Sequence, residues 1–395
     1  MKIISIQPEL AESGKDSLCS VVEEIEAVGL GKPDFVSIHY GAGQNVSDLK
    51  AFMTEALPTT ALHGGSSCLG VMSDQQMQPL DGNGLGAFVI FDPEGSYGSA
   101  AQSFDDSPEV AAQQAALMAL EKAGRAGEVP DMVWLTVTAG HEEAVLRGLR
   151  AMFGEDLPVY GGTAADNDIS GQWSLFGPEV VCHQGVVVSV MFPSGLISSS
   201  YNSGYAPLEN QGIVTRVDGR RLIEIDGQPA AAVYHRWTGG AVPIAYDSPL
   251  SVLAEATFWP LGRVTHEVAG VPFHLLAHPG IAHPDGSLEM FADLEEGDRL
   301  WQMHGSAHSL VSRAARVACF ARGNLDCEPV GALVVFCGGC MLAVQDRMDE
   351  VKAGIDEHLN GMPWLGIFTF GEQGQLPGGP SRHGNLMISC TVFGN

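Results

Sequence analysis

The feature that most constrains the fold of this chain is an internal repeat. Residues 33–43 read PDFVSIHYGAG and residues 130–140 read PDMVWLTVTAG, an offset of 97 residues. The same offset relates LHGG at 62–65 to VYGG at 159–162, with no gap between the two landmarks. Two landmarks at one offset indicate a duplicated structural unit.

Both copies predict the same order of elements. Apolar residues recur three and four positions apart in NVSDLKAFMTEAL and HEEAVLRGLRAMF, which predicts a helix between the landmarks. A further helix precedes each copy, KDSLCSVVEEIEAVG in the first and SPEVAAQQAALMALEKAG, opening on a serine N-cap, in the second. Apolar strands at 86–95 and 187–195 close them. We therefore predict an α/β fold with mixed sheets, built from a helix–strand–loop–helix–strand–loop–strand unit duplicated at about 15–95 and 107–195.

A third, looser copy lies near the C-terminus. The helix SAHSLVSRAARVACFARG leads to a strand at 329–336, and the loop Cys337–Gly339 follows. The helix AVQDRMDEVKAGIDEHL and strands at 363–370 and 385–393 complete the copy. In this alignment the loop Cys337–Gly339 takes the place of Gly41–Gly43 in the first copy.

A different segment, roughly 205–300, separates the second copy from the third. It begins with a strand pair joined by an Asp-Gly turn and a short helix with proline in its first turn. We place the domain boundary in the polar stretch NSGYAPLENQG. The chain is thus predicted to have two domains, residues 1–208 with the internal duplication and residues 209–395.

Composition excludes several classes of protein. The 395 residues include 47 acidic and 20 basic side chains, a formal net charge of −27, which argues against binding to nucleic acid or anionic membranes. No apolar run approaches 18 residues, so membrane insertion is not expected. The N-terminal stretch MKIISIQPELAESGKDS lacks the apolar core of a signal peptide, and we expect a cytoplasmic protein. Eight cysteines in a chain of this length are expected to be free thiols.

Motifs of catalysis and metal binding are missing from the sequence. There is no G-x-S-x-G elbow, no G-x-x-x-x-G-K-[ST] loop and no H-E-x-x-H pair, so we predict no enzymatic activity. No Cys-x-x-Cys-His is present, which excludes covalently attached c-type haem. Non-covalent haem needs only one axial His or Cys and leaves no spacing to read, so haem stays open as a cofactor.

The stretch VVFCGGCML, residues 334–342, places Cys337 and Cys340 after an apolar strand and before a predicted helix. This order is typical of a dithiol redox site. The repeat explains the loop without redox chemistry, because the other copies have no cysteine at the matching positions. Ordinary loop thiols are the favoured interpretation, with a redox pair as the alternative.

The loop TAADND offers candidate ligand contacts in Thr163, Asp166 and Asn167. Backbone N–H groups at the end of a strand and the start of a helix favour anions, and a ligand carboxylate would suit such a place. The alternative is that the glycines of these loops only permit tight turns.

A second group of candidates lies between two apolar strands near the C-terminus. Glu372, Arg382, His383 and Asn385 bring mixed charge into a segment rich in glycine and proline. Functional residues are often found on such loops, and the alternative is a solvated hairpin tip.

In these motifs the chain resembles the FIST family, bacterial sensory proteins with a FIST N domain followed by a FIST C domain. The N-domain resemblance rests on LHGGSSCLGVMSD and YGGTAADND. The C-domain resemblance rests on LIEIDGQPAAAVY, the cysteine-bearing loop after VVF, and PWLGIFTFGEQGQLPGGPSRHGN. The motifs occur in the expected order over essentially the whole chain.

The resemblance implies a non-enzymatic sensor that binds a small ligand, such as an amino acid or a small carboxylate. Its output would pass through a separate signalling partner, such as a histidine kinase of a two-component system, a cyclic-dinucleotide enzyme or a chemoreceptor. A haem-binding nitric oxide sensor regulating a histidine kinase is the runner-up, and a thiol-redox protein is the third hypothesis. The predicted ligand-binding residues are Thr163, Asp166, Asn167, Cys337, Glu372, Arg382, His383 and Asn385.

Overall fold

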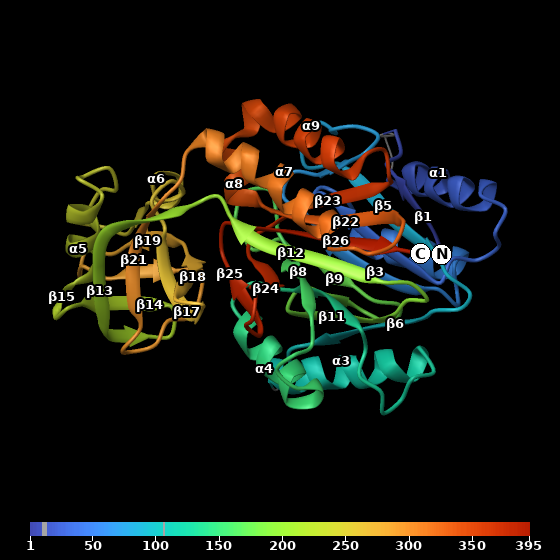
Figure 1. The fold of residues 1–395 in the computed structure, drawn as a ribbon, viewed down its shortest axis with the longest axis horizontal. Coiled ribbons are helices and arrows are strands. Elements are labelled where there is room, and N and C mark those ends of the chain that lie inside the picture. Colours follow the sequence, from blue (N-terminus) through green and yellow to red (C-terminus); the bar gives the residue numbers. More distant parts are fainter. Residues whose placement is uncertain (10–13, 106) are drawn as a thin grey trace.

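The computed structural model describes residues 1–9, 14–105 and 107–395. Residues 10–13, within the N-terminal stretch considered above, and residue 106 lie outside the described residues. Figure 1 shows an α/β body that contains both termini and a β-rich segment at the opposite end of the molecule. Over the described part of the chain, none of the helices has the length and apolar character needed to cross a bilayer.

Three units of one architecture build the α/β body, so the third copy expected from the sequence is present. In each unit the first strand pairs antiparallel with the last, the last pairs antiparallel with the second, and the second pairs parallel with the third. The first unit consists of β1 (Lys2–Ile6), α1 (Gly14–Ala27), β2 (Phe35–Tyr40), α2 (Val46–Ala56), β3 (Ala61–Ser66), β4 (Val71–Ser73) and β5 (Leu85–Phe91).

The second and third units repeat this strand order. Helices of the second unit lie below the sheets in Figure 1 and those of the third lie above them. The second unit consists of β6 (Ser96–Ser103), α3 (Pro108–Lys122), β7 (Met132–Val137), α4 (Glu142–Phe153), β8 (Val159–Thr163), β9 (Leu175–Phe176), β10 (Val181–Cys182) and β11 (Gly185–Phe192). The third consists of β12 (Ile197–Ser203), α7 (Ala307–Gly323), β22 (Pro329–Cys337), α8 (Gly338–Ala343), η1 (Gln345–Arg347), α9 (Met348–Leu359), β23 (Trp364–Thr369), β24 (Glu372–Gln375), β25 (Ser381–Gly384) and β26 (Met387–Gly394).

The strand register shifts the predicted alignment of the third copy by one residue. Cys337 lies opposite Thr369 in the parallel pair β22–β23, as Tyr40 lies opposite Ser66 in β2–β3. Cys337 therefore corresponds to Tyr40 rather than to Gly41. It ends a strand, and the glycines after it begin the short helix α8 instead of forming a loop.

The predicted helices begin near the expected residues, but the capping of α3 and the continuity of the helix after Cys337 differ from the prediction. Ser306 caps α7 with a capping box formed with Ser309. Ser107 stands at the N-cap position of α3, but its side chain makes no capping hydrogen bond, so that part of the prediction is wrong. The single helix expected after the Cys337 loop is broken, because the backbone leaves helical geometry at Val344 and α9 starts only at Met348.

Both Gly-Gly pairs, expected in loops, lie inside strands β3 and β8. A Cβ on Gly65 would lie 2.8 Å from Cγ2 of Thr136, in the second unit. A Cβ on Gly162 would lie 2.2 Å from Cγ2 of Thr369, in the third. The glycines are needed because neighbouring units approach these strands too closely for any side chain.

Each unit lends strands to the sheet of another. The hairpin β9–β10 of the second unit extends the first unit's sheet, β24–β25 of the third extends the second's, and β4 of the first extends the third's. The three units therefore form a closed ring. Three backbone hydrogen bonds follow the same ring, from N–H to C=O: Ala165 to Ser66 (3.0 Å), Phe370 to Thr163 (3.2 Å) and Cys68 to Phe368 (2.9 Å).

Residues 206–304, the β-rich segment, leave the third unit after β12 and return at α7. They form a nine-stranded sheet with its own apolar core. The predicted boundary at residue 208 falls within the long strand β13, and the division into two domains stays a prediction. The segment contains β13 (Ala206–Asp218), β14 (Arg221–Ile225), β15 (Gln228–Pro229), α5 (Ala230–Trp237), β16 (Leu250–Ser251), α6 (Leu253–Ala256), β17 (Leu261–Val268), β18 (Val271–Ala277), β19 (Pro279–Ala282), β20 (Leu288–Met290) and β21 (Arg299–His304).

We expect Gly162→Ala to lower the free energy of unfolding by about 1–3 kcal/mol, because the new methyl group overlaps Thr369 at the contact between units. Gly323→Ala is the matched control, since nothing lies within 4 Å of its added Cβ, and its effect should stay within about 0.5 kcal/mol. Urea unfolding measures both. Equal stability of the two variants would contradict the tight contact.

Candidate functional site

The TAADND loop uses its polar side chains to hold its own backbone. The buried Asp166 carboxylate accepts the backbone N–H groups of Ile169 (2.6 Å) and Gln172 (2.8 Å). These two hydrogen bonds hold Ile169 in a left-handed conformation (φ 60°), which is costly for a β-branched residue. Asn167 Oδ1 accepts the N–H of Leu69 (3.1 Å), in the first unit. Asp166 and Asn167 therefore position the loop, and their contact with a ligand stays a prediction.

Ile169 lines a small cavity where the β-rich segment meets the α/β body. Its volume is about 30 Å³, enough for roughly one or two water molecules. Two of the predicted residues, Cys337 and Asn385, line it. Asn385 Oδ1 accepts the backbone N–H of His278 (3.0 Å), and burial lowers the pKa of the His278 ring to about 4. The full lining is Ile169, Leu253, His278, Phe291, Cys337, Gly339, Leu342, Phe370 and Asn385.

This cavity does not fit haem. Pockets for drug-sized ligands and cofactors usually have about 300 Å³ or more, and the cavity that offers His278 and Cys337 is far smaller. The two side chains that could ligate iron are thus packed against their neighbours.

Burial also opposes a reactive thiol at Cys337. It raises the pKa of this thiol well above its usual range, and the neighbouring Cys340 raises it further. Burial and the Cys337 sulfur likewise raise the pKa of Glu372, whose carboxyl group accepts hydrogen bonds from Thr369 Oγ1 (2.8 Å) and Met387 N–H (2.9 Å). The raised pKa values favour the neutral thiol of Cys337 and the neutral carboxyl group of Glu372. A dithiol redox site needs a thiolate instead, so this environment opposes a redox role for Cys337.

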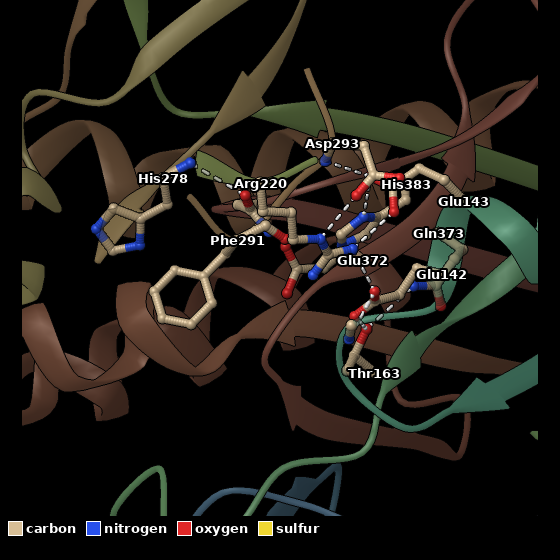
Figure 2. Close-up of polar contacts among 12 residues, drawn as sticks. Glu142, Glu143, Thr163, Arg220, His278, Phe291, Asp293, Glu372, Gln373 and His383 are labelled. Atoms are coloured by element: carbon tan, nitrogen blue, oxygen red, sulfur yellow. Dashed lines mark hydrogen bonds and ion pairs between the residues drawn. The ribbon is translucent and has the colours of Figure 1, made fainter. Parts of the chain in front are cut away.

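Near Glu372, a cluster of charged side chains joins the α/β body to the β-rich segment (Figure 2). Arg220, between β13 and β14, donates to Glu142 (2.6 Å) and Glu143 (2.7 Å), the first two residues of α4. Its Nε donates to Asp293 (2.8 Å). On β25, His383 Nδ1 lies 3.0 Å from Glu143 Oε1. We call these five residues the Arg220 cluster.

Internal ion pairs offset most of the charge of the Arg220 cluster. Burial alone would raise the pKa of Glu143, but His383 and Arg220 together lower it well below its usual range. Glu142 also accepts from Gly140 N–H (3.0 Å) and from Thr163 Oγ1 (3.0 Å). The sequence-predicted Thr163 and His383 thus meet at this cluster.

The same cluster contains a geometry that could suit a metal ion. Donor atoms of Glu142, Glu143 and His383 lie within 4.8 Å of one another, the one such group found in the described part of the chain. The Arg220 guanidinium already supplies a positive charge to both carboxylates. The geometry therefore identifies an ion-pair network rather than a metal centre.

Beside the Arg220 cluster lies an open cleft of about 490 Å³, within the usual range for small-molecule sites. One wall comes from α4 and the residues after it, and Arg382 projects from β25. The other wall belongs to the β-rich segment. Four arginines and four acidic residues line it: Arg147, Arg150, Arg263, Arg382, Glu143, Glu155, Asp293 and Glu295, with Ala151.

Arg382 differs from the other arginines of this cleft. Arg150 pairs with Glu155 (3.5 Å) and Arg263 with Asp298 (3.2 Å), whereas no described residue forms an ion pair or hydrogen bond with the Arg382 guanidinium. Its Nε is buried without a partner. Burial lowers the pKa of Arg382, and the nearby Arg150 and Arg263 lower it further. The carboxylates of Glu155 and Glu295 act in the opposite direction and raise this pKa, and a bound anion would stabilise the unpaired cation further.

Sequence reasoning found Arg382 and His383 but missed the other residues of the Arg220 cluster. Glu143, Arg220 and Asp293 lie 73 to 240 positions from the residues they contact. The acidic pair at the start of HEEAV was the one available signal, because carboxylates at a helix N-terminus are often used electrostatically.

Comparison with protein families gives the class of protein that these features belong to. A FIST N domain model matches residues 34–228 and a FIST C domain model matches residues 230–375. The chain belongs to the FIST family, as its motifs indicated.

Two of its relatives are described as uncharacterized proteins. One from Mycobacterium tuberculosis is 27% identical over 247 residues, which are 60% of this chain and 62% of that protein. One from Mycobacterium bovis is 25% identical over 253 residues, 60% of this chain and 61% of that protein. The match thus spans about three fifths of each relative.

Among solved structures, cyanuric acid hydrolase from A. caulinodans aligns over 100% of this chain and 99% of its own, with 10% identity and a TM-score of 0.35. A score this low carries no argument about fold or activity.

We expect Arg220→Met to lower the free energy of unfolding by about 3–5 kcal/mol, because it leaves the Glu142 carboxylate, 1% exposed, without its cation. Arg147→Met is the control. Arg147 and its partner Glu109 are 53% and 43% exposed, so its loss should cost less than about 1 kcal/mol. Urea unfolding at neutral pH compares them, and similar losses would contradict the buried network.

We expect Cys337 and Cys340 to resist alkylation in the folded protein, since both are buried, while the exposed Cys319 reacts. Mass spectrometry of peptides after brief iodoacetamide treatment at pH 7.5 shows which thiols are labelled. A Cys337–Cys340 disulfide formed by mild oxidation, and reversed by thioredoxin, would revive the redox hypothesis.

Proposed function

We propose that this protein is a cytoplasmic sensory protein that binds an amino acid or a small carboxylate and signals through a separate partner, such as a histidine kinase or a cyclic-dinucleotide enzyme. FIST domains are associated with sensory signal transduction and small-ligand binding. The proposal locates the ligand in the cleft between α4, β25 and the β-rich segment.

The observation that carries the proposal is the unpaired Arg382 guanidinium in a cleft of balanced charge. Planar guanidinium groups bind carboxylates through two parallel hydrogen bonds, and the Arg382 guanidinium forms no ion pair with a described residue that a ligand would have to displace. Glu295 lines the same cleft and forms no ion pair with any described residue. An α-amino acid carries one carboxylate and one ammonium group, and would pair with Arg382 and Glu295 together.

The location of the cleft supports a role in signalling. Its walls come from two parts of the molecule that the Arg220 cluster holds together. A ligand bridging Arg382 and Glu295 would favour one relative position of these parts, and a partner could recognise that position. The acidic surface, with a formal net charge of −27, makes a cationic patch on the partner a suitable counterpart.

In this proposal the other predicted residues hold in place the elements that surround the cleft. Thr163 bonds to Glu142 and His383 to Glu143, at the start of the helix that forms one wall. Asp166 and Asn167 belong to the adjoining loop, and Cys337 and Asn385 line the small cavity. Glu372 lies on β24, where its carboxyl group accepts hydrogen bonds from Thr369 and Met387.

A thermal-shift screen with the twenty amino acids and a panel of dicarboxylates tests the proposal. A ligand at 100 times its Kd should add about 2.7 kcal/mol to the free energy of unfolding. Arg382→Gln should abolish the shift, because it removes the unpaired cation. Arg316→Gln, on α7, is the matched control and should keep it.

An empty screen would contradict the proposed ligand class. A shift that survives in Arg382→Gln and is lost in a Cys337 variant would place the ligand in the small cavity instead.

A further inference from the structure

His383 lies where three parts of the protein meet. It sits on β25 of the third unit and is 2% exposed. Nδ1 faces Glu143 on α4 of the second unit, which in turn contacts Arg220 of the β-rich segment. Glu143 Oε1 also accepts the backbone N–H of Asp293 (3.0 Å). One imidazole thus completes a chain of contacts that crosses the whole junction (Figure 2).

The other ring nitrogen has no partner. His383 Nε2 is buried and makes no hydrogen bond. Gln373 lies directly opposite His383 in the β24–β25 ribbon, and its Oε1 is also buried without a partner. A Cβ on Gly371 would lie 2.3 Å from His383 Nε2, so only glycine leaves room beside the ring. An unpaired donor site and an unpaired acceptor therefore occupy facing positions.

Charged groups around the imidazole come from α4, the β-rich segment and β25 itself, and the β-rich strand β18, which also packs on β25, carries His274, whose pKa is lowered by burial. Helix α4 contributes Glu142 and Glu143, and the β-rich segment contributes Arg220 and Asp293. The strands β8 and β24 contribute the neutral groups of Thr163, Gln373 and the buried Glu372. On its own strand the neighbouring residue is Arg382, which lines the cleft.

We propose that His383 is a proton-operated clamp: protonated, it holds the second unit, the third unit and the β-rich segment together at the cleft, and on losing its proton it loosens that junction. The biological role of this clamp rests on the proposed function, because Glu143, Asp293 and Arg382 line the proposed ligand cleft. Through these residues the protonation of His383 makes ligand binding depend on pH.

The charge balance gives the direction of the response. With His383 protonated, two cations face the three carboxylates of the Arg220 cluster. With His383 neutral, Arg220 alone faces them, and the wall of the cleft becomes more negative by one charge. Deprotonation therefore disfavours an anionic ligand beside Arg382.

The titration range follows from the surroundings of the ring. Burial alone would lower the pKa of His383, but the carboxylates of Glu143 and Glu142 raise it above its usual value near 6.5. A raised pKa in the folded state stabilises the protein fully below the pKa of the unfolded chain. This contribution is lost as the pH rises through the folded-state pKa, so the clamp opens at a pH above the usual imidazole value near 6.5.

The protonated ring also has a second acceptor in reach. Nδ1–H donates to Glu143, and rotation of the Gln373 side chain would bring Oε1 to Nε2–H across the ribbon. Two donors then meet two acceptors, whereas the neutral ring uses only the first pair. This difference favours the protonated form through hydrogen bonding as well as through charge.

The test uses the full-length protein without ligand, labelled with ¹³C-histidine, from pH 5.5 to 9.5. The His383 ring resonance, assigned by its loss in His383→Gln, should titrate above 6.5. Glu143→Gln should move its midpoint down by at least one pH unit, which is a tenfold change in the proton-binding constant. Glu155→Gln, at a 69% exposed carboxylate of the same cleft, is the matched control and should leave the midpoint within about 0.3 units, roughly a twofold change in the proton-binding constant.

Hydrogen exchange over the same pH range tests whether the junction loosens. After correction for the intrinsic rate, peptides covering 289–295 and 381–385 should exchange several-fold faster above the His383 midpoint in the unmodified protein. In His383→Gln the corrected rates should no longer depend on pH. A His383 midpoint at or below 6.5, or corrected rates independent of pH in the unmodified protein, overturns the proposal.

The proposed function can be contradicted while the clamp proposal still holds. Titration and loosening in the absence of ligand, together with an empty ligand screen at both pH 6 and pH 9, would leave the clamp standing and remove the amino acid or carboxylate as its ligand.

Discussion

The closed ring of strands exchanged among three units is the constraint on which the rest of the structure depends. Each of the three sheets in the α/β body borrows its edge from another unit, so none of these sheets is complete on its own. The contacts that close the ring leave no room for side chains at Gly65 and Gly162. Pairing with a strand of another unit covers the hydrogen-bonding edge of each sheet, which stabilises the association of the three units.

The candidate site is a consequence of that ring. The ribbon β24–β25 of the third unit pairs with β8 of the second, which carries His383 to the start of α4. The β-rich segment, inserted between β12 and α7, then meets the same helix through Arg220. A partly buried arginine that is shared among three carboxylates, one of them fully buried, is costly to remove, so this network holds the junction in a defined geometry.

Several local features could be predicted from the sequence, and others could not. The duplicated unit, its helices and most of its strands follow from apolar periodicity, and the family follows from short motifs in a fixed order. The serine cap of α3 and the unbroken helix after Cys337 were wrong, because packing decided those details. Asp166 and Glu372 stay predicted ligand contacts, and the hydrogen bonds that their carboxyl groups accept within the protein could not be predicted from the sequence.

The sequence by itself determined the repeat, the order of elements and the residue types available for binding, because these depend on spacing along the chain. Only the tertiary structure decided which charges meet. Arg382 is unpaired, and Glu143 is shared by Arg220 and His383, because strands from three separate regions converge there. Electrostatic energy depends on distances in space and on burial, and neither is encoded in any one stretch of residues.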